Sequence, residues 1–380
     1  MNKFRVILIF LILSATGCKK EGCTDSLANN FNEKAKIDDG SCNYDPTFEI
    51  PSTYHFLDDL GNSTVNYAGQ VDRLNQLIEM TNYMKNGTSQ AINYQVLSDM
   101  FSNSNGNGNG SFSFSSTKQL KDKCFEIDQA LFENWMGDLS ISSVNHDSIA
   151  INGRSGVLSS GSNTYLFNQN GIEVLQLVEK GLMGSVFMYQ ALNVYFGLEK
   201  MNVDNSTPVD QANNQHYTQM EHHFDEAFGY FGVDPSFPSL IPQNFWGKYC
   251  NIQNNILNSN EDMMSNFLLG RAAIANSEML FRDQAILNIR KEWEEICAHQ
   301  AIDYLNQAIS YFGNDQGMCL HTLSEAYIFS WNLRYLPLET KRITNAEHVE
   351  IMNMFPTNFW EVTIADINNI KSLISSHYGI

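Results

Sequence analysis

The chain has 380 residues, with 23 Lys and Arg against 42 Asp and Glu, so its formal net charge is −19. Nucleic acids repel a chain this acidic, which excludes a nucleic-acid-binding function and predicts no nucleic-acid partner. Hydrophobic residues make up 43% of the sequence and aromatic residues 12%, which is enough to build the core of a large globular domain.

The first 18 residues, MNKFRVILIFLILSATGC, have the three-part form of a secretory signal. Lys3 and Arg5 precede a short apolar core, and small residues then lead into Cys18. The core is shorter than the roughly 20 residues that span a bilayer. Small residues directly before a cysteine resemble a lipobox, at which bacterial lipoprotein signals are cut and the cysteine is acylated. The resemblance implies a signal peptide over residues 1–17 and a lipid on Cys18; an ordinary signal with an incidental cysteine is the alternative.

A lipid on the cysteine predicts that the membrane is a partner, because acyl chains bury many methylene groups in a bilayer. Lipoproteins that stay at the inner membrane commonly carry Asp after the cysteine, whereas this chain has Lys19 and Lys20. We therefore expect an outer membrane lipoprotein of the cell envelope, on either the periplasmic or the surface face.

Residues 18–45 are expected to form an acidic tether. Cys23 and Cys42 bracket the run GCTDSLANNFNEKAKIDDGSC, and an oxidising envelope favours a disulfide between them. A loop of this size gains about 3 kcal/mol of stability from the bond. The run resembles an acidic module of secreted proteins of Gram-negative bacteria, with Phe31 where the module has Tyr.

The same run is reminiscent of calcium-binding thrombospondin type 3 repeats, which implies calcium bound through oxygens of Asp25, Asn29, Asp38 and Asp39. Four oxygens are fewer than calcium usually takes, so a disulfide-stapled spacer is the favoured alternative. The remaining cysteines are scattered on apolar faces and are expected to be buried packing residues. They are Cys124, Cys250, Cys297 and Cys319.

The region 46–380 predicts a single, mainly α, bundle-like domain. Alternating apolar residues around Gly61-Asn62 predict one short β-hairpin over residues 54–67. The Gly/Asn/Ser tract 102–116 predicts a mobile loop, because nothing in it can be buried. A polar stretch, 137–169, is expected to be irregular.

About ten helices are expected, from apolar residues at helical spacing and from residues that cap helix ends. The segment 172–199 is apolar almost all round. Its glycines and polar residues favour a central, closely packed helix over a membrane span. The other expected helices cover residues 69–85, 90–100, 120–135, 216–231, 261–282, 283–312 and 315–336, with two more after Thr344 and Thr363.

His223 and Glu226 are candidate metal ligands on the helix expected at 216–231. Their spacing of three residues places them side by side on a helix. Metal sites in helical bundles use this spacing, and so do ordinary ion pairs on helix surfaces. Both interpretations remain open from the sequence.

His321, Glu325 and Asn332 form a single polar stripe on a helix that is otherwise apolar and should be buried. A buried carboxylate needs a positive partner. That partner could be a metal, an arginine such as Arg271 or Arg73, or the histidine itself. The stripe therefore predicts either a binding site or a structural network.

Convergence of the two pairs would complete a shared site with ligands from His223, Glu226, His321 and Glu325. Mixed nitrogen and oxygen ligands of this kind suit iron or zinc. The alternative is that each pair belongs to a structural ion-pair network and that the two helices do not meet at these positions.

Three strings resemble a family of Gram-negative, Bacteroidota-type lipoproteins that carry a domain of unknown function. They are YAGQVDRLNQLIEMTNYMK at 67–85, HHFDEAFGYFG at 222–232 and HTLSEAYIFSWNLRY at 321–335. The family is mentioned alongside imelysin-like proteins, which are helical envelope proteins linked to iron acquisition and once described as peptidases. Imelysin-like proteins carry a His-x-x-Glu motif on a helix. His223-Phe-Asp-Glu226 has that form, without the surrounding Gly-x-His context.

Three function classes follow from these patterns. We favour a binding or accessory lipoprotein that acts in metal uptake with an outer-membrane uptake partner. A scaffold or surface-interaction protein whose helices only pack is the second class. An imelysin-type metallopeptidase is the third, because such an enzyme needs a metal with an open coordination position and the sequence has no HExxH motif.

Overall fold

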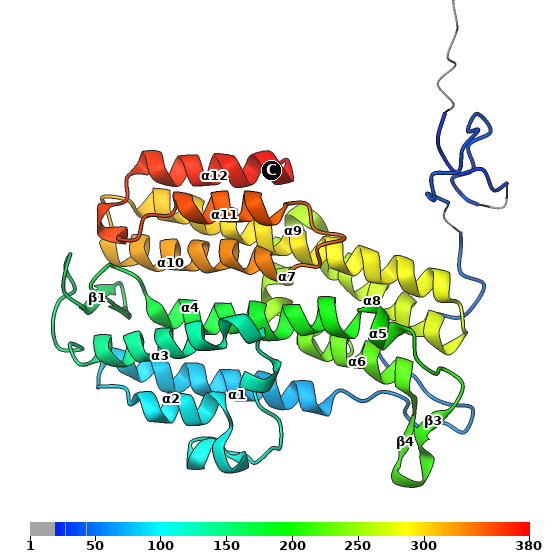
Figure 1. Cartoon of the computed structure of the whole chain (residues 1–380), viewed down its shortest axis with the longest axis horizontal. Coiled ribbons are helices and arrows are strands. Elements are labelled where there is room, and N and C mark those ends of the chain that lie inside the picture. The colour runs from blue at the N-terminus through cyan, green and yellow to red at the C-terminus, as the bar shows by residue number, and fades with distance from the viewer. Residues whose placement is uncertain (1–19, 27, 43) are drawn as a thin grey trace, which may run out of the picture. The chain divides into compact units, whose positions relative to one another are not determined.

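A computed structural model describes residues 20–26, 28–42 and 44–380 (Figure 1). The expected signal peptide and Cys18 lie outside these residues. The chain divides into two compact units between Glu49 and Ile50. The first unit contains the disulfide-bonded segment, and the second is a helical domain.

Twelve α-helices build the helical domain within the described residues, and the predicted mainly α fold is confirmed. Capping boxes begin three of them, where the hydroxyl of Thr218, Thr344 or Thr363 accepts from the backbone N–H three residues later. The helices are α1 (Ala68–Lys85), α2 (Tyr94–Phe101), α3 (Gln129–Ser143), α4 (Val174–Leu182), α5 (Leu198–Met201), α6 (Gln219–Phe231), α7 (Phe245–Leu257), α8 (Ser259–Ala275), α9 (Met279–Tyr311), α10 (Gln316–Asn332), α11 (Asn345–Met354) and α12 (Ile364–Tyr378).

The central helix of the domain is α4 with its continuation through two π-helical segments, η6 (Met183–Met188) and η7 (Gln190–Tyr195). It packs against α1, α3, α6 and α10, and most of its side chains are buried. A methyl group at Gly184 would overlap the Asn332 amide of α10, so this crossing requires glycine. Within the described residues, no helix is both long and apolar enough to span a bilayer.

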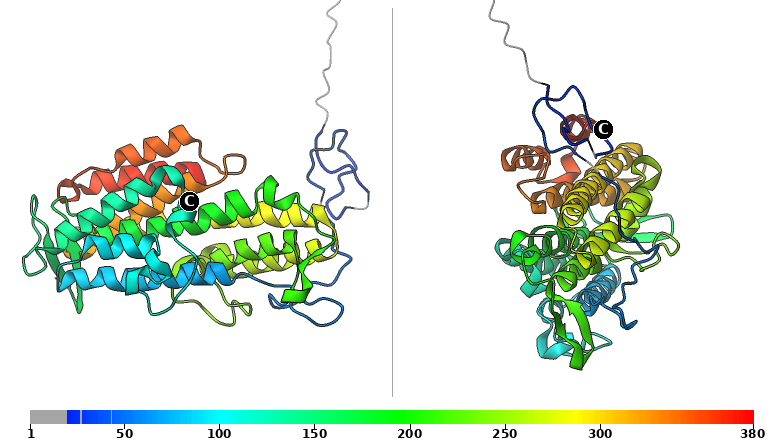
Figure 2. Two further views of the ribbon diagram at one scale, coloured as in Figure 1. Left: turned by 60° about the horizontal axis from the view of Figure 1, so that its bottom comes forward. Right: turned by 90° about the vertical axis from the view of Figure 1, so that its right-hand side faces the viewer.

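The longest helix, α9, has 33 residues and packs along α8 and α10. Its Trp293 meets Trp246 of α7 edge to face, with ring centroids 5.7 Å apart, and Trp246 meets Phe329 of α10 in the same way at 5.9 Å. α11 and α12 lie on the outer side of α9 and α10, and α1 to α3 lie beyond α4 on the other side (Figures 1 and 2).

Two short antiparallel strand pairs accompany the helices. β1 (Gly156–Ser160) pairs with β2 (Asn163–Phe167), and β3 (Pro208–Asp210) pairs with β4 (Gln215–Thr218). The first pair lies inside the stretch 137–169, so the prediction of irregular structure there is wrong. Gly161 makes the turn with φ of +56°, which glycine tolerates, and the apolar end of β2 is buried.

The β-hairpin predicted over residues 54–67 is confirmed only as a short chain reversal, with one antiparallel β-bridge between Leu57 and Ser63 and no strand long enough to be named. Part of its backbone is hydrogen-bonded to side chains of the helices. The backbone N–H of Asn66 donates to Asp225 of α6, and the backbone carbonyl of Thr64 accepts from Arg271 of α8. The segment is therefore held against the bundle.

The tract 102–116 is more ordered than its composition predicts. Phe112 is 7% exposed and stacks on Phe114 with ring centroids 5.7 Å apart. The amide of Asn103 donates to two backbone carbonyls at the end of the tract, at 2.7 and 2.6 Å. The prediction that nothing in the tract 102–116 can be buried is therefore wrong. The buried ring of Phe112 and the hydrogen bonds of Asn103 stabilise the glycine-rich turns.

One helix was not expected, and two helix boundaries differ from the expected ones. α7 has no counterpart among the predicted helices. The break between α8 and α9 lies at residues 276–278, where Ser277 has φ of +59°, instead of after residue 282. The helix predicted at 120–135 begins only at Gln129. Boundaries of this kind depend on caps and tertiary contacts more than on apolar spacing.

Candidate functional site

His321 of α10 lies between two carboxylates. Its Nδ1 is 2.5 Å from Oε2 of Glu173, and its Nε2 is 3.3 Å from Oε2 of Glu325. The imidazole also lies against the ring of Tyr165, with centroids 4.5 Å apart. Because each ring nitrogen faces a carboxylate, the arrangement favours a doubly protonated ring that donates on both sides.

Lys180 of α4 adds a second cation to this group. Its side chain is 9% exposed, and its Nζ lies 2.9 Å from Glu179. Burial lowers the pKa of Lys180, but Glu179 and Glu325 outweigh burial and raise it to about 12. Burial likewise opposes charge on His321, yet Glu173 and Glu325 raise the pKa of the imidazole. The polar stripe of α10 thus belongs to a buried ion-pair network.

On α6, His223 does not pair with Glu226. Its Nδ1 lies 2.9 Å from the backbone carbonyl of Lys200, and burial lowers the pKa of the imidazole. The histidine beside Glu226 is His222, whose Nε2 lies 3.9 Å from Oε2 of the carboxylate. The His/Glu pair is therefore spaced i, i+4 instead of i, i+3.

His222 is oriented by its other ring nitrogen. Nδ1 lies 2.9 Å from the backbone carbonyl of Asn66, so the proton of the neutral ring is held at Nδ1 and the lone pair at Nε2 is left open. The ring stacks on Tyr217 with centroids 4.7 Å apart. Glu226 accepts from the amide of Gln70 at 2.9 Å and from the hydroxyl of Tyr195.

A polar cavity of about 290 Å³ opens on this pair, between α1, α6, η7 and the segment that precedes α3. Three basic side chains, Arg73, Lys118 and Lys123, line it with a single carboxylate, Glu226. This ratio is opposite to that of the whole chain, in which acids outnumber bases 42 to 23. The cavity is thus a local positive site on a strongly negative protein.

The charge of Lys123 is only partly compensated, by the more distant carboxylates of Asp122 and Glu226. Among the described residues, no acceptor or carboxylate lies within hydrogen-bond or ion-pair distance of its Nζ, and the ring of Tyr195 lies below it at 5.8 Å. Burial lowers the pKa of Lys123, and the nearby Arg73 lowers it further. Burial and a neighbouring cation both destabilise a charged ammonium group. A bound anion would stabilise it strongly.

Arg73 is held rigidly at the cavity wall. Its Nε donates to the carbonyl of Gln119 at 2.7 Å and its Nη1 to that of Gly69 at 3.2 Å. The nearest carboxylate is that of Asp122, 3.6 Å from Nη2 and with a side chain that is 48% exposed. Arg73 therefore presents a fixed and incompletely neutralised charge.

The structure does not bring His223, Glu226, His321 and Glu325 together. The described residues contain no group of three or more histidine, cysteine, aspartate or glutamate side chains placed to hold a metal ion. Glu325 has its counter-ions in His321 and Lys180, so its burial requires no metal and no second histidine. The shared four-ligand site is not formed.

Neither arginine considered as a partner of Glu325 reaches it. Arg271 is fully buried, with Nε 2.9 Å from Asp225 and Nη1 2.7 Å from Glu221, both on α6. Burial raises the pKa of Asp225 to about 6, although the guanidinium of Arg271 and the hydroxyl of Tyr54 act in the opposite direction. This network fastens α8 to α6.

The sequence patterns missed the residues that complete both sites. Lys180 and Glu173 belong to the nearly apolar segment 172–199, where any charged residue signals a buried partner. Lys123 and Tyr195 carry no such signal, because their role depends on two segments that are 72 residues apart in sequence.

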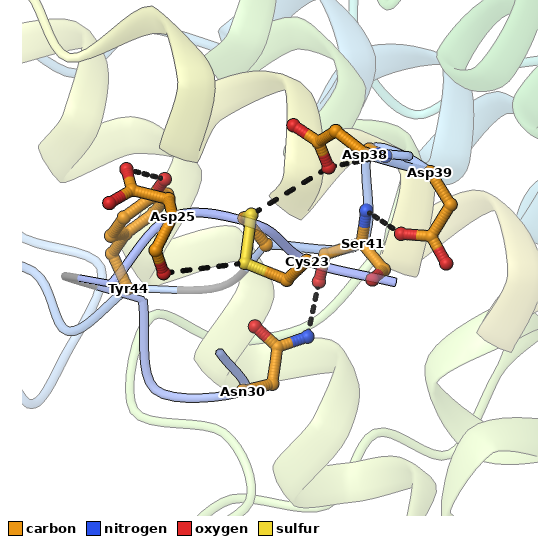
Figure 3. Close-up of a disulfide and its surroundings, with 9 residues drawn as sticks. Cys23, Asp25, Asn30, Asp38, Asp39, Ser41 and Tyr44 are labelled. Atoms are coloured by element: carbon orange, nitrogen blue, oxygen red, sulfur yellow. Dashed lines mark hydrogen bonds between the residues drawn. A yellow bond between two sulfur atoms is a disulfide. The ribbon is translucent and has the colours of Figure 1, made fainter. Parts of the chain in front are cut away.

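In the first unit, Cys23 and Cys42 form the expected disulfide. Figure 3 shows Asp25 on one side of this bond and Asp38 with Asp39 on the other. Asp25 accepts from the hydroxyl of Tyr44, and Asp38 and Asp39 accept from nearby backbone N–H groups. Each of the three carboxylates implied as calcium ligands thus accepts a hydrogen bond within the first unit.

The remaining cysteines are buried free thiols, as their apolar surroundings predict. Burial raises their pKa, to about 12 for Cys124 and Cys250 and to about 11 for Cys319. Thiols of this kind are unreactive at neutral pH.

Comparison with known proteins gives one match. A family model described as a domain of unknown function, DUF4856, matches residues 51–380. The match covers the helical domain with both groups of residues described above, and leaves the disulfide-bonded segment outside. No curated protein and no solved structure matches the chain.

Proposed function

We propose that this chain, which belongs to the family of the domain of unknown function DUF4856, is a lipid-anchored binding protein of a bacterial cell envelope. The signal-like residues 1–17 and Cys18 support the anchor, and the negative charge is consistent with an exported protein that avoids nucleic acid. We place it at the outer membrane, where a membrane uptake complex would be its partner.

The helical domain, in this proposal, binds a small anionic ligand in the cavity beside His222 and Glu226. The observation that carries the proposal is the ammonium of Lys123, which no carboxylate among the described residues contacts directly, next to the fixed guanidinium of Arg73. A carboxylate or phosphate would lie between these cations, while Glu226 and His222 would take hydrogen bonds from hydroxyl or amine groups of the same molecule.

This charge pattern also narrows the expected role in metal acquisition. Arg73 and Lys123 repel a bare Fe²⁺ or Zn²⁺ ion, whereas they attract an anionic complex such as a ferric carboxylate. A role in iron uptake would therefore operate through the chelate, and the imelysin-like resemblance of the motif on α6 is consistent with such a role.

Isothermal titration calorimetry tests the ligand class. The full chain with Cys18→Ala, which cannot be acylated, is titrated with citrate, phosphate, ferric citrate and zinc chloride. We expect the anions to bind and Lys123→Gln to weaken them at least tenfold, which corresponds to about 1.4 kcal/mol. Lys121→Gln is the matched control, because Lys121 is paired with Glu133 at 2.6 Å and lies outside the cavity.

The other function classes are outcomes of the same measurements. If no anion binds, or if both lysine variants behave alike, the cavity is not a binding site and the scaffold function takes its place. A protein that binds zinc more tightly than citrate and cleaves peptides would instead favour the imelysin-type metallopeptidase.

The anchor has its own test. Cys18→Ala should abolish labelling by a radioactive fatty acid and move the protein from the membrane fraction to the soluble fraction. Labelling that survives this substitution would contradict the lipoprotein proposal and leave the ligand proposal untouched.

A further inference from the structure

A second cavity, of about 620 Å³, lies where α5 and the N-terminal end of α9 meet the end of η7 and the start of α6. In Figure 1 these segments lie at one end of the helical domain. Met201, Met220 and Met279 line the cavity together with Phe196 and Leu198. Methionine walls adapt to apolar ligands of different shapes, because the thioether side chain is flexible.

Arg282 places a positive charge in this apolar wall. Its side chain is 11% exposed, and its Nη1 lies 3.2 Å from the sulfur of Met220 and 3.1 Å from that of Met279. The same Nη1 donates to the backbone carbonyl of Met201 at 2.8 Å, and Nε and Nη2 donate to Asp283 at 2.9 and 2.7 Å. Among the described residues, the carboxylate paired with Arg282 is that of Asp283, whose side chain is 60% exposed. The guanidinium is thus buried more deeply than its counter-ion.

Arg290, one of the residues that line the same cavity, repeats this pattern. Its Nε and Nη2 donate to the carbonyls of Leu192 and Phe196 at the end of the central helix. Its Nη1 lies 3.3 Å from Glu339, which is 65% exposed, whereas Arg290 itself is 10% exposed. Burial lowers the pKa of Arg290. Asp283 and Glu339 also line the cavity, so one side of it carries two buried guanidiniums together with their more exposed counter-ions.

We propose that this cavity binds a single-chain amphiphile with an anionic head group, such as a medium-chain fatty-acid carboxylate. The head group would take the place of the exposed carboxylates of Asp283 and Glu339 beside the guanidiniums of Arg282 and Arg290, which match a carboxylate in geometry. The alkyl chain would cover the methionine, phenylalanine and leucine side chains. The volume falls in the range of small-molecule sites, about 300–1,000 Å³. This inference is independent of the function proposed for the cavity beside His222.

Calorimetry with a series of acids tests the chemistry. The full chain with Cys18→Ala is used, so that acyl chains on the protein cannot compete. From octanoate to decanoate we expect binding to tighten about fifteenfold, since each buried methylene contributes about fourfold. Decanol and decyltrimethylammonium should bind at least tenfold more weakly than decanoate. Affinity that does not depend on chain length, or equal binding of all three head groups, would overturn the proposal.

A matched pair of leucines tests the location. Leu198 lines the cavity and is 87% exposed, so Leu198→Asp should fold normally and should weaken decanoate at least tenfold by placing a like charge at the entrance. Leu280 is 79% exposed and is not part of the lining, so Leu280→Asp should leave binding unchanged. Equal effects of the two substitutions would place the amphiphile elsewhere.

Arg282→Gln tests the head-group contact. This variant should lose the preference for decanoate over decanol, and retention of the full preference would overturn the role of Arg282. Should the variant fail to fold, the leucine pair still decides the proposal.

Two further comparisons distinguish a single-chain ligand from a membrane phospholipid, and this cavity from the cavity beside His222. Flotation of the Cys18→Ala protein with phosphatidylglycerol vesicles, abolished by Leu198→Asp, would replace the single-chain ligand with a membrane phospholipid and overturn the proposal as stated. Lys123→Gln should leave decanoate binding unchanged, and Leu198→Asp should leave citrate binding unchanged. The two variants therefore show whether the decanoate proposal, the citrate proposal or both are contradicted.

Discussion

Arg271 is fully buried, and its charge is balanced by Asp225 and Glu221 on the neighbouring helix. Removal of one partner from a buried ion pair leaves the other charge desolvated, which costs about 3–5 kcal/mol. We therefore expect Arg271→Ala to lower the free energy of unfolding by this amount in urea denaturation. Lys291→Ala, on the exposed side of α9, should change it by less than about 0.5 kcal/mol. A loss below 1 kcal/mol for Arg271→Ala would contradict the network's structural role.

Glu292 of α9 is the residue with the clearest expected pH dependence. Among the described residues, no donor reaches its Oε1. Burial raises its pKa to about 7, and Asp262 and Glu295 raise it as well. The folded protein therefore binds the proton more tightly than the unfolded chain, whose glutamate titrates near 4.5. Stability from this group is lost as the pH rises from about 4.5 to about 7.

Glu292→Gln should remove that loss. Thermal unfolding at pH 5, 6, 7 and 8 should show a flatter pH profile and a higher melting temperature than the parent at pH 8. Glu350→Gln, at an exposed position of α11, should reproduce the parent profile. If the melting temperature of Glu292→Gln depends on pH as strongly as that of the parent, ionisation of the Glu292 carboxylate does not destabilise the fold.

At the scale of the element, the central helix depends on Gly184, where a methyl group would overlap Asn332 of α10. Overpacking of this kind typically costs about 1–3 kcal/mol, and we expect Gly184→Ala to lower the free energy of unfolding by that amount. Gly137 of α3 has open space at the same position, so Gly137→Ala should be neutral or stabilising by up to about 1 kcal/mol. Urea denaturation of both variants measures the two changes in the free energy of unfolding. Equal changes would show that they arise from helix propensity alone and not from the contact with Asn332.

The π-helical turns of the central helix belong to the same scale. Two such segments in succession are uncommon, and π-helical turns frequently occur near functional sites. Here η7 carries Tyr195, which contributes to the polar cavity, and ends next to Phe196, which contributes to the apolar one. Neither residue stands out in the apolar pattern of 172–199, because a buried helix has no periodicity from which one face can be chosen.

At the scale of the whole molecule, the disulfide unit and the helical domain form two separate compact units. Reduction of Cys23–Cys42 should therefore leave the thermal unfolding of the helical domain unchanged. We expect a shift of the melting temperature below about 1 °C, because a change of 1 kcal/mol would shift that of a domain of this size by about 1.4 °C. Circular dichroism of the full chain with and without reductant measures it, with Cys23→Ser/Cys42→Ser as the control. A larger shift would mean that the two units stabilise each other.

Features that rest on local or repetitive patterns could be predicted from the sequence. Apolar spacing determined that the domain is mainly α, and its glycines and polar residues determined that the segment 172–199 is a central helix. Two other features could be predicted because each depends on residues close together in the chain. They are the helix caps at Thr344 and Thr363 and the pairing of Cys23 with Cys42.

Contacts between side chains of distant segments became apparent only in the folded chain. Glu325 required a positive partner, but nothing local to α10 identifies Lys180 of α4, which stands 145 residues earlier. The pairing of Glu226 with His222 instead of His223 depends on the carbonyls of Asn66 and Lys200, which orient the two rings. Such choices are set by packing between distant segments, and a helical pattern records which face of a helix is buried but not what it is buried against.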